Sequence, residues 1–95
     1  MSLKQAYEQK LKAQLDEWKN EIDILKARAD KTEADVQLEY YKNIESLREK
    51  QDAARNKLTE LENASEDAWE DLKAGIEVAW ADLRDSIKSA SSHFK

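Results

Sequence analysis

The sequence lacks cysteine and proline, and it contains a single glycine and a single histidine. Without cysteine the chain can form no disulfide framework and offers no thiolate for catalysis or metal binding. Turns draw heavily on glycine and proline, so their scarcity argues against a fold rich in loops. His93 stands without spaced cysteines, histidines or carboxylates that would complete a metal site. We therefore expect neither a metal nor another cofactor.

A surplus of positive charge is also missing. Sixteen Lys and Arg face 21 Asp and Glu, for a net charge of −5. No basic patch is available to neutralise phosphates, which excludes nucleic acid as an expected partner, and an acidic chain is repelled by anionic lipid. No apolar run approaches the roughly 18 residues of a membrane span, and the segment 1–8 carries no apolar leader, so we expect a cytoplasmic protein. No nucleophile–base pair or glycine-rich phosphate loop stands out, so we expect no enzyme.

What the sequence does contain is an 11-residue repeat. The segments 68–76 and 79–87 both begin Ala-Trp and place Asp-Leu three and four residues after the alanine, and a degraded third copy runs from Ala90 to Phe94. Eleven residues make about three helical turns, which is the spacing of a hendecad coiled coil. Opposite charges three residues apart, such as Asp23 and Lys26, support a helix with a solvated outer surface.

The same apolar stripe extends over almost the whole chain, as one helical coiled-coil domain over 1–95. Its spacing is hendecad-like over 11–43, heptad over 44–64 and hendecad over 65–94, and it averages about 3.6 residues per turn, as in an undistorted helix. These spacings predict an all-α fold with a single long helix per chain, covered by other copies in a homo-oligomeric coiled coil. The residues expected at the oligomer interface are Leu11, Leu15, Trp18, Ile22, Leu25, Val36, Tyr40, Ile44, Leu47, Ala54, Leu58, Leu61, Ala68, Trp69, Leu72, Ile76, Ala79, Trp80, Leu83 and Ile87.

Two sites could interrupt this helix. The segments 30–33 and 63–66 each resemble a capping box, in which a polar residue is followed three residues later by Glu. They divide the chain into three parts of similar length, which suits an antiparallel three-helix bundle as the alternative fold. Against a break, the apolar stripe stays in phase through both sites and neither contains glycine or proline.

The three tryptophans are the most unusual residues on the stripe. Trp is typical of water–lipid interfaces, but Trp18, Trp69 and Trp80 all lie among apolar stripe positions, which favours packing. Trp69 and Trp80 each follow a small alanine, and small residues beside large rings widen a bundle. This arrangement favours a tetramer over a trimer or a dimer.

The segments 6–19 and 65–75 are similar to small bacterial coiled-coil proteins that are labelled as stress-response proteins and that resemble natural hendecad coiled coils. The resemblance spans nearly the whole chain. It implies a bacterial source, a cytosolic location and a parallel helical assembly, and it implies no activity, cofactor or catalytic residue. The periodicity by itself fixes neither the parallel orientation nor the number of chains.

Together these features predict a structural or interaction protein: a parallel, self-assembling coiled-coil rod with a role connected to stress. Other protein partners are not indicated. The alternative function is an amphipathic helix that binds lipid surfaces, as in apolipoproteins, although a narrow apolar face with an acidic polar face is unusual for that class. For the rod, Ile76→Asp is expected to disrupt assembly, because it would bury an unpaired charge between chains.

Overall fold

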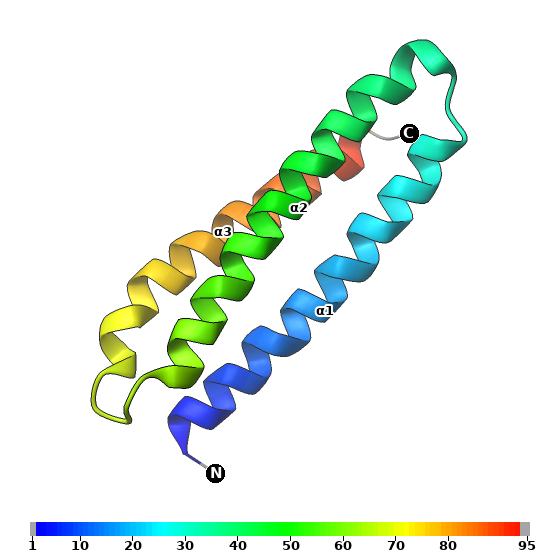
Figure 1. The fold of residues 1–95 in the computed structure, drawn as a ribbon. Helices are drawn as coiled ribbons and strands as arrows, with labels where there is room; N and C mark the ends of the chain where they lie inside the picture. Colours follow the sequence, from blue (N-terminus) through cyan, green and yellow to red (C-terminus); the bar gives the residue numbers. More distant parts are fainter. Residues whose placement is uncertain (1, 94–95) are drawn as a thin grey trace.

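The computed structural model describes residues 2–93 and shows three helices: α1 (Leu3–Asp30), α2 (Ala34–Asn63) and α3 (Trp69–His93). Each helix runs antiparallel to the one before it, and all three pack side by side in a bundle that measures 51 × 20 × 18 Å (Figure 1). The N-terminus lies at the same end as the α2–α3 turn, and α3 ends beside the α1–α2 turn.

The prediction of one long helix per chain is wrong, and the antiparallel three-helix bundle is the fold of this chain. The all-α class is confirmed. The helix breaks at 31–33 and 64–68, within or beside the two segments that resemble capping boxes. Folding back buries the apolar stripe within the chain, with no partner to be recruited and no loss of translational freedom on association. Continuity of phase through the turns was therefore no proof of a continuous helix.

The helix ends differ in how their free backbone groups are satisfied. At the start of α1, Ser2 and Gln5 form a capping box: Ser2 Oγ accepts from the Gln5 N–H at 3.1 Å, and Gln5 Oε1 accepts from the Ser2 N–H at 3.2 Å. Before α3, Ser65 Oγ accepts from the Ala68 N–H at 3.2 Å. Glu33, the N-cap of α2, makes no side-chain cap bond, so this helix start is held by other contacts.

The core is a column of stripe residues that runs the length of the bundle. Each helix contributes its buried positions at spacings of three, four or seven residues, as expected for an amphipathic helix. Complete burial of one such side chain is worth about 1.5–3 kcal/mol. The buried apolar residues are Leu11, Leu15, Ile22, Leu25, Ala29, Ile44, Leu47, Ala54, Leu58, Leu61, Trp69, Ile76, Trp80, Leu83, Ile87 and Ala90.

Candidate interaction site

Most residues predicted at an oligomer interface lie inside this bundle. Trp18, Tyr40, Leu72 and Ala79 are partly buried against the core, whereas Val36 is exposed in the first turn of α2 and Ala68 is exposed in the α2–α3 turn. The remaining stripe residues are buried against helices of the same chain. The stripe is therefore covered without a second copy. Phe94, at the end of the third repeat copy, lies outside the described residues.

Within residues 2–93, three polar groups are buried with the stripe. Gln51 donates from Nε2 to the Leu15 carbonyl across the α1–α2 contact at 3.3 Å. Lys4 donates from Nζ to Glu8 at 2.7 Å and to the Glu62 carbonyl at 3.3 Å. The second of these bonds joins the start of α1 to the end of α2. The Trp80 indole N–H has no hydrogen-bond partner among the described residues, although the side chain is only 6% exposed.

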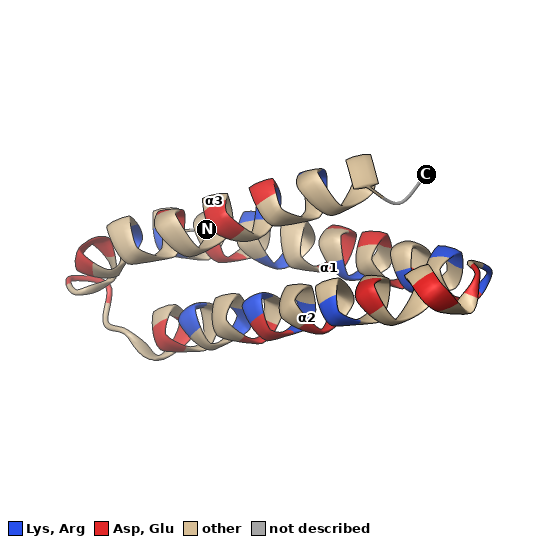
Figure 2. Ribbon diagram, turned by 90° about the horizontal axis from the view of Figure 1, so that it is seen from above, with Lys and Arg blue, Asp and Glu red and all other residues tan. Residues whose placement is uncertain are grey.

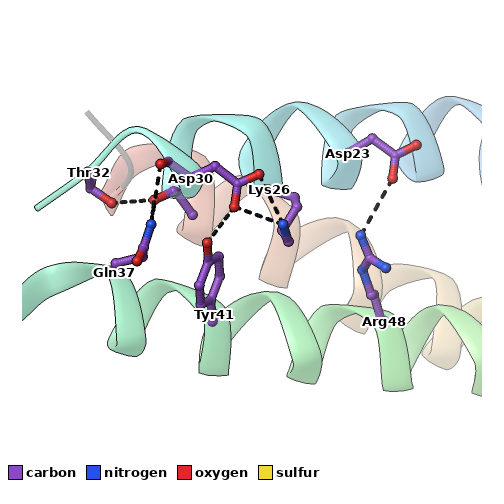
Figure 3. Close-up of polar contacts among 8 residues, drawn as sticks. Asp23, Lys26, Asp30, Thr32, Gln37, Tyr41 and Arg48 are labelled. Atoms are coloured by element: carbon purple, nitrogen blue, oxygen red, sulfur yellow. Dashed lines mark hydrogen bonds and ion pairs between the residues drawn. The ribbon is translucent and has the colours of Figure 1, made fainter. Parts of the chain in front are cut away.

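The α1–α2 turn carries the densest group of polar contacts, which we call the turn clamp (Figure 3). Thr32 Oγ1 donates to the Ala29 carbonyl at 2.6 Å. Gln37 reaches back from the first turn of α2 and donates from Nε2 to the carbonyls of Ala29 at 3.1 Å and Asp30 at 3.3 Å. The Ala29 carbonyl also accepts from the Thr32 N–H at 3.1 Å, so these two side chains add to the backbone bonds that close the end of α1.

The Asp30 side chain forms the second half of the turn clamp. Its carboxylate accepts from Lys26 Nζ at 2.8 Å within α1 and from the Tyr41 hydroxyl on α2. The Lys26 ammonium also lies 5.1 Å from the centre of the Tyr41 ring, within the range of a cation–π contact. The turn clamp therefore joins the last turn of α1 to the first two turns of α2.

The same contacts shift the protonation equilibria of these groups. The hydrogen bond from Lys26, and after it the one from Tyr41, holds the Asp30 pKa below its ordinary value. The hydrogen bond to Asp30 raises the pKa of Lys26 and is also the main cause of the raised Tyr41 pKa. All three groups lie at the surface, so solvent screens these interactions.

The turn clamp was not predicted from the sequence. Asp23 was expected to pair with Lys26, but Lys26 binds Asp30, one helical turn further along, and Asp23 lies 3.7 Å from Arg48 on α2 (Figure 3). Asp30 was expected to cap a following helix, whereas it is the last residue of α1. The Lys26–Asp30 spacing of four residues was a readable signal for their pair. The contact with Tyr41 depends on the fold-back and had no signal in the sequence.

A second mixed cluster lies where α1 meets the start of α3. The rings of Tyr7 and Trp69 are 5.7 Å apart, and Lys73 lies over both rings at 5.5 and 5.7 Å. Burial, together with the nearby Glu77 carboxylate, raises the pKa of Tyr7. This cluster seals the end of the core opposite the turn clamp.

Residues of both charge signs are distributed along all three helices (Figure 2). A groove of about 340 Å³ lies between α2 and α3, with Ser46, Lys50 and His93 among its lining residues. Lys50 Nζ lies 3.2 Å from Asp82 and donates to Ser86 Oγ at 2.7 Å. The groove's ammonium is therefore already neutralised by a carboxylate of the same chain.

Comparisons with known proteins add no identification: searches of protein families, curated proteins and solved structures find nothing that matches this chain. Among residues 2–93, no group of three or more His, Asp or Glu side chains is placed to hold a metal ion. Within the same residues, no helix combines the length and apolarity needed to cross a membrane.

Proposed function

We propose that this chain is a structural or interaction protein that acts through helix–helix contacts, without catalytic chemistry of its own, and that its first partner is a second copy of itself. The observation that carries the proposal is the phase of the apolar stripe. The buried positions keep the same helical periodicity through both turns, although an isolated three-helix bundle does not require that continuity. A role under stress and a cytoplasmic location belong to the same proposal, supported by the resemblance stated above.

The experiment is light scattering coupled to size exclusion over a wide range of protein concentration. A compact monomer has a mass of 11.0 kDa. The proposal expects a population at a multiple of this mass that grows with concentration. A constant mass of 11.0 kDa up to millimolar concentration would overturn it.

A lipid-surface protein is the second candidate, and the same in-phase stripe favours it. If the bundle opened on a membrane, the three buried faces would become one apolar face. Trp69 and Trp80 are already buried in the closed bundle. A blue shift of their fluorescence would therefore not report lipid binding. Co-sedimentation with vesicles of zwitterionic and of anionic lipid is the direct assay. Absence of the protein from both pellets would remove this candidate.

A further inference from the structure

The stripe continues across the α1–α2 turn as if the turn were absent. Tyr40 and Ile44 follow Ala29 by 11 and 15 residues, which is close to three and four turns of a helix with about 3.6 residues per turn. All three side chains pack in or against the core of the folded-back bundle. If the turn became helical, α1 and α2 would present one common apolar face.

The backbone of this turn needs little change to become helical. It contains no glycine or proline, and none of the described residues has a positive φ. Lys31, at φ −100° and ψ −1°, is already near the helical region. Glu33 has a helical φ of −65° and departs in ψ, which is 149°. Rotation about a few bonds, including ψ of Glu33, would therefore straighten the segment.

We propose that the α1–α2 turn is a hinge through which two copies of this chain exchange α1. In the exchanged dimer, α1 of one copy packs on α2 and α3 of the other, so each half is still a three-helix bundle. Short hinge loops are the usual sites of such exchange, which needs no new surface. This inference names a route for the self-association in the proposed function and rests on it.

The contacts divide into those that survive exchange and those that do not. Contacts far from the hinge, such as Gln51 with the Leu15 carbonyl and Lys12 with Glu62, can form again between copies. The Gln37 bonds to the carbonyls of Ala29 and Asp30 require the chain to fold back and are lost. The bond from Thr32 to the Ala29 carbonyl spans three residues and can persist in a helix. The Gln37 bonds therefore favour the closed monomer over the exchanged dimer.

Glu33→Pro tests the hinge because it suits the closed form alone. The φ of −65° at Glu33 matches that of proline, whereas proline inside a straightened helix removes a hydrogen bond and clashes with the preceding turn. Glu33→Ala is the matched control, since it removes the same carboxylate and permits both forms. Gln37→Ala should favour exchange, by about fivefold in the association constant for each hydrogen bond that the closed form loses.

Each protein is incubated at high concentration, and its mass and X-ray scattering in solution are measured. The wild type and Glu33→Ala should form a species of twice 11.0 kDa. A helix over residues 3–63 is about 90 Å long at 1.5 Å per residue, against 51 Å for the closed bundle, so the longest dimension should rise accordingly. Glu33→Pro should remain helical and monomeric.

A second measurement serves if Glu33→Pro fails to fold. One chain carries Lys12→Cys and another carries Glu62→Cys, and a short bis-maleimide is added to their mixture. Exchange predicts a covalent product of the two chains, and no such product argues against exchange. A wild type that dimerises while Glu33→Pro dimerises equally well would overturn the hinge and leave self-association standing. A wild type that remains monomeric throughout would overturn both.

Discussion

Two apolar residues on α3, Ile76 and Val78, provide the sharpest test of which face of the helix holds the fold together. They are two positions apart, so they point in nearly opposite directions on a helix. Ile76 is 0% exposed in the core, whereas Val78 is 71% exposed on the outer face. Truncation of each to alanine should therefore have very different effects.

Ile76→Ala removes buried carbons and leaves a cavity, which costs about 2–5 kcal/mol in a packed core. The stability of a chain of this size is about 5–14 kcal/mol at 0.05–0.15 kcal/mol per residue. The variant should therefore lose a large part of its free energy of unfolding, with a melting temperature lower by about 4–8 °C for each kcal/mol lost. Val78→Ala should stay within about 0.5 kcal/mol of the wild type.

Urea unfolding followed by circular dichroism at low protein concentration measures both values. If Ile76→Ala cost less than about 1 kcal/mol, or Val78→Ala cost as much as Ile76→Ala, the assignment of the buried face would be refuted. The burial of Ile76 within one chain also changes the result expected for Ile76→Asp. In the bundle it places an unpaired charge inside a single chain, so it should unfold the monomer in addition to preventing assembly.

Three further substitutions have definite expected outcomes. Gly75→Ala should stabilise α3 by about 1 kcal/mol in thermal unfolding, because an added Cβ meets no atom within 4 Å; a loss of stability would show that the glycine is needed. Gln51→Leu should raise the free energy of urea unfolding by about 1 kcal/mol, since apolar burial offsets one modest hydrogen bond; destabilisation would indicate that the amide is essential to the core. The lowered Asp30 pKa means that its contribution is present above the ordinary value of 3.8 and is lost as pH falls through the lower folded value. Asp30→Asn should remove that part of the acid sensitivity, and an unchanged pH profile would contradict the turn clamp.

The sequence was sufficient to identify the buried face but not to identify what covers it. Helical spacing predicted Leu15, Ile22, Leu61 and Leu83 as stripe residues, and all four are buried. Periodicity reports which side of a helix avoids water, and that side is the same in a coiled coil and in a bundle. Val36 lies on the stripe and is nevertheless exposed, because a position near a helix end has fewer neighbours to cover it.

The turns and the turn clamp were less predictable from the sequence than the buried face. A break at 30–33 was one of two alternatives, and its residues are compatible with both a helix and a turn. Gln37 and Tyr41 contribute to the turn only after the chain has folded back, so their bonds depend on tertiary contacts that periodicity does not contain. Local propensity is a weak guide wherever such contacts decide the conformation.

The in-phase stripe and the folded-back structure are consistent because both forms bury the same face. Within one chain, the short turn keeps α1 close to α2 at a high effective concentration, so the closed bundle prevails in dilute solution. A second copy can displace α1 only at a protein concentration high enough that association, together with the gain from straightening the turn, offsets the loss of the Gln37 bonds. The position of that balance, and therefore the number of chains, depends on the turn residues 31–33, on Gln37 and on the protein concentration more than on the stripe itself.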